Sequence, residues 1–409
     1  MNSDTDRRLL TRVGLRNYKS IAACDVQLAQ LSFLVGPNGA GKSNFVDALR
    51  FVAESLRLSL DHALRDRGGI QEVRRRSGGH PNHFGIRVEF KLPGANGFYS
   101  FAVGAKPRGG FAIQREECEI RHAGAARDRD FYRIDDGVVV ASSVSPSPAA
   151  KSDRLYLVSL SGTAAFRPLY DALEGMGFYH LDPGQIRELQ PADPGVLLKR
   201  DGSNIASVLS NLDAHAPELK HRIEEYLARV VPGVAGVDRR AVGPKETLEF
   251  RQDVRGAQHP WRFPAINMSD GTLRALGVLV ALFQANGGTG HRLVGIEEPE
   301  IALHPAAAGI LTDSLREASE RVQVVVTSHS PELLDDAEIP DEAIRAVVSE
   351  YGETRIGPVD QATRSALHDH LYTAGELLRL DQLRPDPELS QPRQLDLFEP
   401  LDLFEPATS

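Results

Sequence analysis

The chain reads Gly36-Pro37-Asn38-Gly39-Ala40-Gly41-Lys42-Ser43 immediately after the apolar segment Leu31–Val35. This octapeptide matches the pattern G-x-x-x-x-G-K-[ST], in which glycines let successive backbone N–H groups turn toward phosphate oxygens. Residues 42–60 follow with apolar side chains three or four positions apart, which predicts an amphipathic helix. Strand, glycine-rich loop and helix therefore occur in the order that a phosphate-binding loop requires.

The residue types in this loop suit a nucleotide held with Mg²⁺. We expect Lys42 to neutralise phosphate oxygens and the Ser43 hydroxyl to ligate the metal. The alternative is a glycine-rich turn that binds nothing. The flanking strand and helix favour binding of ATP and Mg²⁺ over that alternative.

Two carboxylates follow a second apolar segment, Leu293–Ile296. Side chains at the carboxyl end of a buried strand can face a nucleotide site in an α/β sheet. Hydrolysis needs one acid beside the Mg²⁺ and one that polarises the attacking water. We expect Glu297 to be the metal-side acid and Glu298 the catalytic base; a solvated acidic turn is the alternative.

Polar residues also end the next predicted strand, at Thr327–Pro331. A neutral histidine can donate one hydrogen bond while accepting another, so His329 can sense a γ-phosphate from this position. The alternative is a structural histidine.

A further candidate site precedes the helix predicted near Leu273 and consists of Ser269, Asp270 and Gly271. Such residues at a helix start most often form an N-cap. An exposed helix N-terminus is also an anion site, which can receive a phosphate from another subunit.

Composition limits the class of protein. The 409 residues are 41% hydrophobic and 25% charged, which is typical of a soluble globular chain, and the formal charge of −9 argues against coating nucleic acid by bulk positive charge. The longest apolar run, residues 276–283, is too short to cross a bilayer, and residues 1–10 are too charged for a signal peptide, so we expect a cytoplasmic protein. The two cysteines, Cys24 and Cys118, exclude a disulfide framework and a Cys-based zinc site.

Patterning divides the chain into three regions. Residues 1–60 and 261–380 alternate strands with helices and predict a split α/β unit with a mostly parallel sheet. Residues 61–260 predict an inserted α+β lobe, within which residues 65–133 hold 14 Arg and Lys against 8 Asp and Glu. Residues 381–409 are Pro-rich and acidic and predict a disordered tail.

Taken in this order, the four elements resemble the ATP-binding-cassette ATPases, and most closely their RecF/SMC-like branch, also described as AAA-type or RecF-type. In this resemblance Lys19, in Leu15-Arg16-Asn17-Tyr18-Lys19-Ser20-Ile21, belongs to an opening strand motif that contacts nucleotide. The other correspondences are Gly36–Ser43 with the Walker A loop, Ser269–Thr272 with the signature loop, Glu297–Glu298 with the Walker B pair, Ile301–His304 with the D-loop and His329 with the switch histidine.

Gln185 is the residue that the resemblance suggests for the Q-loop, where it would contact nucleotide and Mg²⁺. The sequence departs from the family pattern at two positions. The signature reads Ser-Asp-Gly-Thr instead of Ser-Gly-Gly-Gln, and the first Walker B acid is Glu297 instead of Asp. The distance from Ser43 to Ser269 fits neither a transporter cassette nor long coiled-coil arms, and it predicts a compact lobe.

The resemblance implies that ATP joins two heads as a homodimer. Each head would complete its partner's site with Ser269–Thr272, and hydrolysis at Glu298 would release the pair. It further implies that the dimer binds double-stranded DNA at the nucleoid, through phosphate contacts from basic residues of the insertion. The candidates are Arg65, Arg67, Arg74, Arg75, Arg76, Arg127 and Arg129.

The tail contains a tandem hexapeptide, Leu395–Pro400 and Leu401–Pro406, which both read LDLFEP. Its first copy, with the preceding residue, gives Gln394-Leu395-Asp396-Leu397-Phe398. This segment is similar to the short peptide by which bacterial repair and replication proteins dock on the sliding clamp. The alternatives are a degenerate acidic tail or a segment that packs back on the head.

The leading hypothesis is therefore an ATPase of DNA repair, recombination or replication. The alternative is the ATPase component of an anti-phage defence system that regulates a separate effector. A transporter subunit is disfavoured by the spacing of the signature.

Overall fold

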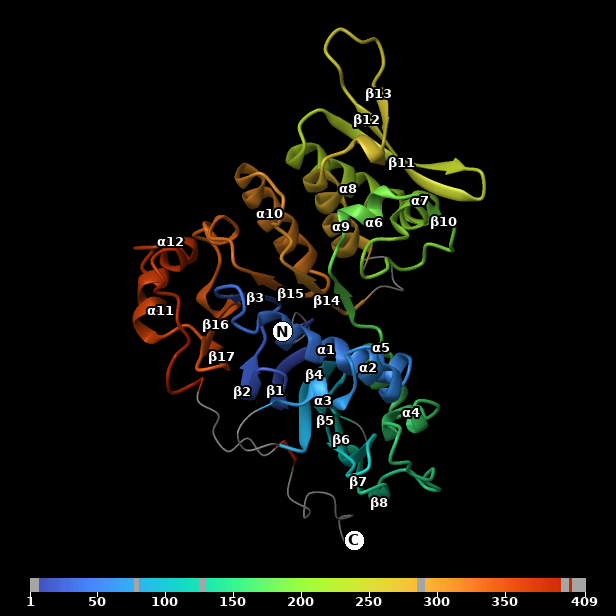
Figure 1. The fold of residues 1–409 in the computed structure, drawn as a ribbon, viewed down its shortest axis with the longest axis vertical. Helices are drawn as coiled ribbons and strands as arrows, with labels where there is room; N and C mark the ends of the chain where they lie inside the picture. The colour runs from blue at the N-terminus through green and yellow to red at the C-terminus, as the bar shows by residue number, and fades with distance from the viewer. Residues whose placement is uncertain (1–6, 77–80, 125–128, 285–290, 391–396, 399–409) are drawn as a thin grey trace.

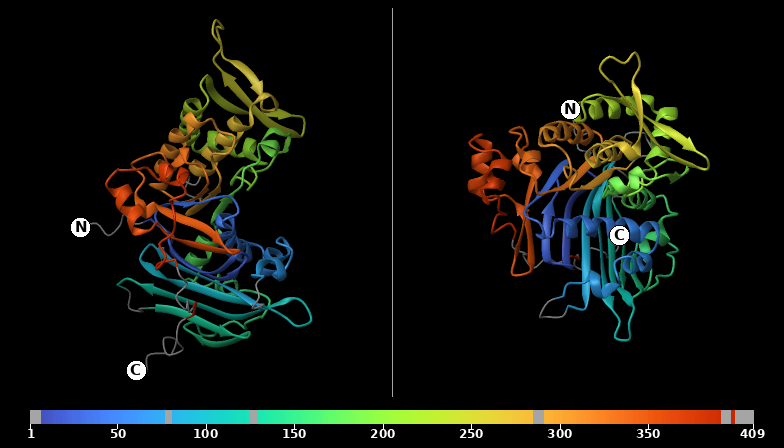
Figure 2. Two further views of the ribbon diagram at one scale, coloured as in Figure 1. Left: turned by 60° about the vertical axis from the view of Figure 1, so that its left-hand side comes forward. Right: turned by 45° about the horizontal axis from the view of Figure 1, so that its top comes forward.

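The computed structural model describes residues 7–76, 81–124, 129–284, 291–390 and 397–398. Its elements stack in layers: a central mixed sheet, an antiparallel sheet below it, and above it helices that carry a small third sheet (Figure 1). The side view in Figure 2 shows the same succession of layers.

The central sheet has six strands. They follow the order β17 (Glu353–Pro358), β16 (Ile344–Glu350), β3 (Leu31–Val35), β15 (Gln323–Ser328), β14 (Leu293–Glu297) and β9 (Gly177–Tyr179). The five strands from β16 to β9 are parallel, and β17 is the antiparallel edge. The expected α/β fold with a mostly parallel sheet is confirmed.

The second sheet is antiparallel throughout. Its order is β2 (Ile21–Gln27), β1 (Leu10–Tyr18), β4 (His83–Leu92), β5 (Ala95–Ala105), β6 (Phe111–His122), β7 (Arg129–Asp135) and β8 (Val138–Ser142). Because β1 pairs with both β2 and β4, the start of the head and the first half of the expected insertion form one sheet.

The expected boundaries at residues 60 and 261 therefore do not separate two structural units. Residues 61–260 do not make one compact lobe, since β4–β8 extend the sheet of β1 and β9 lies in the central sheet beside β14. Only the later part of this range builds a separate subdomain. It contains β10 (Gln190–Pro191), β11 (Val234–Val242) and β12 (Lys245–Gln252), joined by β13 (Trp261–Pro264).

Helices cover both faces of the central sheet. Those of the upper layer are α6 (Pro183–Arg187), α7 (Ile205–His215), α8 (Pro217–Val230), α9 (Asp270–Phe283) and α10 (Ala308–Ser319). The single helix expected over residues 205–230 is two helices, because Pro217 has no N–H for a continuing helical hydrogen bond and instead starts α8. The remaining helices are α2 (Leu60–Arg65), α3 (Ile70–Val73), α4 (Tyr156–Leu160), α5 (Arg167–Glu174), α11 (Gln361–His368) and α12 (Ala374–Arg379), with short 3₁₀ turns at 265–267, 305–307, 332–334 and 341–343.

Helix α1 (Lys42–Arg57) lies between the two large sheets. Successive residues of a strand face opposite sides, and β3 divides its side chains accordingly. Leu34 joins the core that holds α1 and the antiparallel sheet, whereas Phe33 and Val35 join the core under α9 and α10. One strand thus anchors both cores, and the loop that follows it is held from both sides.

The predicted disordered tail, residues 381–409, makes packed contacts at residues 381–390 and 397–398. Leu383 is buried in the core under α9 and α10, and Pro385 forms a bridge with Val359. Leu397 is buried, its carbonyl oxygen accepts a hydrogen bond from Arg87 Nη1 at 3.1 Å, and the Arg115 guanidinium lies 4.5 Å from the Phe398 ring centroid. These contacts favour the alternative in which the segment packs back on the head, here against β4 and β6. Gln394, Leu395 and Asp396 lie outside the described residues.

Among the residues that the structure describes, none of the helices combines the length and the apolar character that crossing a membrane would take.

Phe51 tests the core around α1. Its ring is fully buried and lies 6.1 Å from the ring of Tyr18 and 5.4 Å from that of Phe84. We expect Phe51→Ala to lower the free energy of unfolding by about 3–5 kcal/mol, through lost burial and the cavity left behind. Chemical denaturation measures this, with Leu58→Ala, 55% exposed just beyond α1, as the control. Equal stabilities of the two variants would contradict the two-sided packing of α1.

Candidate functional site

The loop Gly36–Ser43 connects the end of β3 to the start of α1, as the sequence predicts. Gly39 and Gly41 have φ angles of 77° and 102°, which non-glycine residues rarely adopt. A Cβ on Gly36 would lie 1.9 Å from the carbonyl oxygen of Val347, so β16 packs too closely for any side chain there. Pro37, Asn38 and Gly39 are exposed, so the loop presents its backbone to solvent.

Lys42 is buried in this loop and donates hydrogen bonds to the carbonyl oxygens of Gly36 and Pro37 at 2.8 and 2.9 Å. Burial lowers the pKa of Lys42, while the carboxylates of Glu298 and Glu300 oppose that shift. The ammonium group is therefore close to the acid cluster described below.

Thr354, on β17, fixes the phosphate loop from the far edge of the sheet. Its hydroxyl donates to the carbonyl oxygen of Ala40 at 2.9 Å and lies 2.7 Å from the Ser20 hydroxyl, which in turn accepts from Asn44 Nδ2. A Cβ on Gly41 would lie 2.1 Å from the Thr354 Oγ1. Sequence reasoning missed Thr354, because a single threonine in a surface hairpin carries no local signal.

Asp47 lies one turn after Ser43 in α1, and polar or charged side chains from three segments contact its carboxylate. Its carboxylate accepts from the Tyr18 hydroxyl at 2.8 Å and forms ion pairs with Lys19, Arg50 and Arg67. Burial alone would raise the pKa of Asp47, but the charges and hydrogen bonds of Arg67 and Lys19 outweigh it and hold that pKa well below the usual range.

Lys19, the predicted nucleotide contact of the opening strand, is thus placed on Asp47, with 2.5 Å between Nζ and Oδ2. It has a positive φ of 48° in the turn between β1 and β2. Its ammonium therefore lies beside the N-terminal half of α1, the helix that begins at Lys42.

The acid cluster lies at the carboxyl ends of β14 and β15. Glu298 has a φ of 46°, and its N–H donates to the carbonyl oxygen of Thr327 at 2.9 Å, which ties the two strand ends together. His329 Nδ1 lies 3.4 Å from Glu298 Oε1 and 3.8 Å from Glu300 Oε1. The structure therefore brings the predicted base and the predicted switch histidine into one constellation.

Glu300 is a member of this cluster that sequence reasoning missed. Its Oε1 accepts from the Ser328 hydroxyl at 2.6 Å and from the His329 backbone N–H at 3.3 Å. Its Oε2 and His329 Nδ1 are buried atoms without a hydrogen-bond partner in the structure. Buried polar atoms of this kind are satisfied by water or ligand, so both are candidates for contacts to a bound group.

Arg274 approaches the same cluster from α9. It is 7% exposed, and its Nε has no hydrogen-bond partner. Burial lowers the pKa of Arg274, while the charges of Glu298, Glu300 and Asp182 act against the change. Because apolar residues cover most of α9, the inward turn of this one arginine could not be predicted from the sequence pattern.

The signature loop lies at the start of α9 and is exposed. Ser269 Oγ accepts from the Thr272 N–H at 3.2 Å, which is the N-cap that the sequence left open as an alternative. Asp270 pairs with Arg187 at 2.5 Å, and a Cβ on Gly271 would lie 2.4 Å from the carbonyl oxygen of Ala302 in the predicted D-loop region. Within the described ranges, no hydrogen bond or ion pair joins residues 269–271 to residues 36–43.

Gln185 is on α6, and its side chain is exposed. Helix α6 packs on α9, and its Arg187 donates to Met268 O and Asp270, so α6 lies beside the signature loop. In the part of the chain described here, its side chain forms no hydrogen bond to Ser43 or Glu297. Glu297 instead pairs with Arg200, with 3.3 Å between Nη2 and Oε1.

The donor set suits Mg²⁺ held largely by phosphates. Ser43 is exposed, and the side chains of Glu297 and Glu298 are 17% and 25% exposed, so their oxygens face solvent near the loop. The described residues contain no group of three or more His, Cys, Asp or Glu that could hold a metal ion. Mg²⁺ commonly uses one or two carboxylates together with substrate phosphates, and this arrangement fits that pattern.

The arginines expected to contact DNA differ in availability. The side chain of Arg67 is 3% exposed in the Asp47 cluster, and Arg75 is 14% exposed and donates to Ser20 O at 3.0 Å. The prediction of phosphate contacts is wrong for Arg67, whose guanidinium is already enclosed. Arg65 and Arg76 are 79% and 69% exposed and paired to acids of their own turns, and Arg127 is outside the described residues.

Comparison with known proteins shows the family and the fold of this chain. The family described as "AAA domain, putative AbiEii toxin, Type IV TA system" matches residues 31–335. The structure is similar to a solved Smc head bound to the C-winged helix domain of ScpA, with a TM-score of 0.56 and 14% identity over 87% of this chain and 99% of that one. It is also similar to a Smc head domain with an extended coiled coil from Pyrococcus furiosus, bound to the C-terminal domain of ScpA. That match has a TM-score of 0.56 and 12% identity over 89% of this chain and 99% of that one. No curated protein matches the sequence.

Asp47 makes a pH prediction possible. Because its folded-state pKa is lowered, Asp47 stabilises the fold above its unfolded pKa of about 4, and this contribution is lost as the pH falls below that value. We expect Asp47→Asn to lose about 3 kcal/mol of unfolding free energy at pH 7 and to show a shallower loss of stability below pH 4. Denaturation from pH 3 to 7 tests this, with Asp61→Asn, in an exposed pair with Arg65, as the control. An unchanged acid slope in Asp47→Asn would refute the assignment.

Proposed function

This chain belongs to the AAA-domain family described as putative AbiEii toxin, Type IV TA system, and we propose that it hydrolyses ATP as a head that pairs with a second copy of itself. The match to an AAA-domain family and the Smc-like fold support an ATPase of the AAA and SMC-head type, as the resemblance to RecF/SMC-like proteins implied. The individual roles below are proposals for this chain's own residues.

The observation that carries the pairing is the placement of the signature loop. Ser269 and Asp270 are exposed at the N-terminus of α9, where backbone N–H groups and the helix dipole favour an anion. The same loop has no bond to the phosphate loop of its own chain within the described residues. A second copy, related by a two-fold axis, would bring one chain's signature loop to the other's phosphate loop, and the two contacts would be equivalent.

The proposed hydrolytic roles follow from the acid cluster. Mg²⁺, when bound, would neutralise charge on the phosphate oxygens, with Ser43 and Glu297 as its protein ligands. Glu298 would accept the proton of the attacking water at its carboxylate. His329, 3.4 Å from Glu298, would hold that carboxylate or the phosphate in position through the unpaired Nδ1. Lys42 would turn from the loop carbonyls to phosphate oxygens, since a charged acceptor binds an ammonium more strongly than a neutral one.

DNA binding is the proposed use of this cycle. Its support is the excess of basic residues over residues 65–133, although the structure removes Arg67 from the available set. Arg65 remains at the end of α2, Arg74 and Arg76 in the segment after α3, and Arg129 at the start of β7. They would contact phosphates without reading sequence, so duplex affinity is expected to fall with added salt. Docking on a sliding clamp through Gln394–Phe398 would need Leu397 and Phe398 to leave β4 and β6.

A second candidate function is favoured by the family description itself, which names a toxin of a type IV toxin–antitoxin system. In that case the ATPase cycle would control growth inhibition or a separate effector in anti-phage defence. The fold and the nucleotide site are the same in both cases, so only the output differs.

Two variants test the pairing. We expect Glu298→Gln to reduce ATP hydrolysis at least about 100-fold, because a general base is lost, and to accumulate as an ATP-bound dimer. Lys42→Ala is expected to remain monomeric with ATP, because the phosphates lose their main cation. Size-exclusion chromatography with light scattering, with and without Mg·ATP, measures both. A Glu298→Gln variant that stays monomeric at saturating ATP would refute ATP-dependent pairing.

A growth experiment separates the two outputs. If the chain is a toxin-type ATPase, its expression inhibits growth and Lys42→Ala relieves the inhibition. If it serves DNA maintenance, expression is tolerated and duplex DNA stimulates hydrolysis by the purified protein. Growth inhibition without any stimulation by DNA would replace the leading function with the second one.

A further inference from the structure

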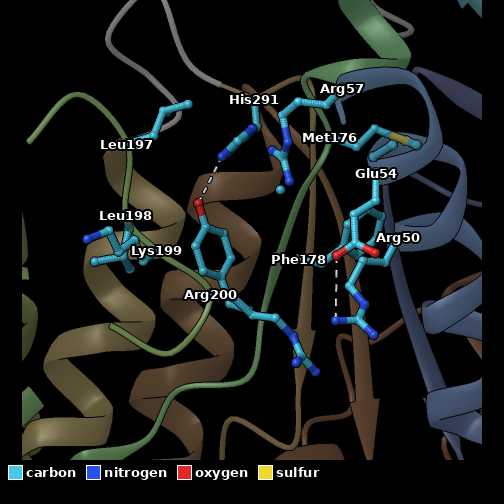
Figure 3. A pocket seen from close by; sticks show the side chains of 13 residues that line it. Arg50, Glu54, Arg57, Met176, Phe178, Leu197, Leu198, Lys199, Arg200 and His291 are labelled. Atoms are coloured by element: carbon cyan, nitrogen blue, oxygen red, sulfur yellow. Dashed lines mark hydrogen bonds and ion pairs between the residues drawn. The ribbon is translucent and has the colours of Figure 1, made fainter. Parts of the chain in front are cut away.

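A cavity of about 340 Å³ opens beside β9, on the edge of the central sheet away from the phosphate loop. We call it the β9 cavity; the residues that define it are Arg50 and Arg57 of α1, Phe178 of β9, and Leu197, Lys199 and Arg200 of the segment before α7. Figure 3 shows the two arginines of α1 on one side and residues 197–199 on the other. The volume is near the lower end of the range of about 300–1,000 Å³ for small-molecule sites.

The β9 cavity is separate from the nucleotide loop. None of its lining residues belongs to Gly36–Ser43. Arg50 is eight residues beyond Lys42 in α1, which corresponds to about 12 Å along the helix axis. A molecule held here would therefore be additional to a nucleotide at the loop.

Cations dominate the lining. Arg50, Arg57, Lys199 and Arg200 line it, against the single carboxylate of Glu54. Lys199 also pairs with Asp193, at 3.3 Å. Glu54 is also the partner of Arg50 at 3.6 Å and of Arg67 at 2.7 Å, so its charge is already shared. Arg57 has no hydrogen bond or ion pair to any described residue. The cavity thus has an excess of positive charge and a guanidinium available for an anion.

The floor of the cavity is polar but fully satisfied. Burial lowers the pKa of His291, so its ring is neutral, and its Nδ1 donates to the carbonyl oxygen of Gly175. Its Nε2 then accepts from the Tyr179 hydroxyl at 2.9 Å, and that hydroxyl accepts from Gln284 Nε2 at 2.7 Å. Because these groups need no ligand, the charged walls are the part of the cavity that selects one.

Apolar side chains complete the walls. Met176 and Phe178 lie on the side of β9, and Leu197 lies opposite. Leu197 is 36% exposed, so it offers apolar surface to whatever enters. A site that combines several cations with apolar walls suits a molecule that has both an anionic group and a ring.

We propose that the β9 cavity binds a small phosphorylated molecule about the size of a nucleoside monophosphate. Its phosphate would lie at the Arg57 guanidinium, with Lys199 turning to it from Asp193, and its ring would contact Phe178 and Leu197. The volume of about 340 Å³ fits a small molecule of this size.

Arg200 would connect this site to hydrolysis. It lines the cavity and also pairs with Glu297, the proposed metal-side acid, at 3.3 Å. An anion in the cavity would attract the Arg200 guanidinium and weaken that pair, which frees the Glu297 carboxylate for a metal ion. This coupling rests on the proposed function of Glu297, whereas binding in the cavity does not.

Isothermal titration calorimetry with AMP tests the binding. The Lys42→Ala background removes the main cation of the phosphate loop, so binding at the β9 cavity is measured on its own. We expect AMP to bind Lys42→Ala, and the further changes Arg57→Ala and Lys199→Ala to weaken it about tenfold or more, since hydrogen bonds to charged groups are lost. Arg65→Ala, which removes an exposed arginine outside the cavity, is the matched control and is expected to change nothing.

Each other outcome of the titration overturns the proposal. Loss of AMP binding in Lys42→Ala alone would assign the binding to the phosphate loop. Equal affinity for AMP and adenosine would show that phosphate is not recognised, and unchanged affinity in Arg57→Ala with Lys199→Ala would exclude the cavity.

A second measurement tests the coupling. The Mg²⁺ concentration that gives half-maximal ATP hydrolysis is expected to shift lower when AMP is present, and this shift is expected to disappear in Arg57→Ala. AMP that binds in the titration but leaves the Mg²⁺ dependence unchanged would overturn the coupling through Arg200. The binding site would stand in that case.

Discussion

The position of α1 depends on the carboxylate of Asp47, one turn beyond the phosphate loop. Tyr18 and Lys19 reach it from the antiparallel sheet, Arg50 from α1 itself and Arg67 from the segment after α2. A buried charge is costly unless it is paired and hydrogen-bonded, so these partners can meet Asp47 only when the antiparallel sheet and the segment after α2 pack against α1 in one register. The apolar packing around α1 supplies stability, while the ion cluster specifies its orientation.

The orientation of α1 determines which groups of the phosphate loop Gly36–Ser43 face solvent. On one side the loop is closed by Val347, whose carbonyl leaves room only for Gly36. On the other side Thr354 binds the carbonyl of Ala40 and presses against Gly41. Both residues come from β16 and β17, about 300 residues further along the chain. The backbone N–H groups therefore face solvent in a conformation set by distant strands, which is the preorganisation that phosphate binding requires.

The sequence was sufficient for features with a local cause. The glycine pattern, the apolar run of β3 and the acids after β14 are dictated by neighbours in the chain, and the structure brings Lys42, Glu298 and His329 together. Features that depend on contacts between distant segments could not be predicted from the sequence. The union of β1 with β4, the role of Thr354 and the inward turn of Arg274 arise from contacts between segments far apart in sequence. The prediction of a phosphate contact for Arg67 was wrong for a related reason. An arginine in a basic stretch is expected to be exposed unless its acid partners on α1 are known.

Charged residues from distant parts of the chain lie close together at the acid cluster. Glu297 has its carboxylate on Arg200, Lys42 has its ammonium on two loop carbonyls, and Arg274 lies buried without a partner for its Nε. Among the described residues, Lys42 and Arg274 form no ion pair with a carboxylate, although Glu298 and Glu300 lie nearby, and Arg200 pairs with Glu297 at 3.3 Å. Each can therefore change partners at little cost when the charge at the site changes, because the interactions it leaves are weaker than those a phosphate or a metal-bound carboxylate provides. Since Arg200 belongs to the segment before α7 and Arg274 to α9, such an exchange of partners would change contacts in the upper layer of helices. The signature loop begins α9, only five residues before Arg274, so the charge at the hydrolytic site and the surface proposed for pairing are joined by one short length of helix.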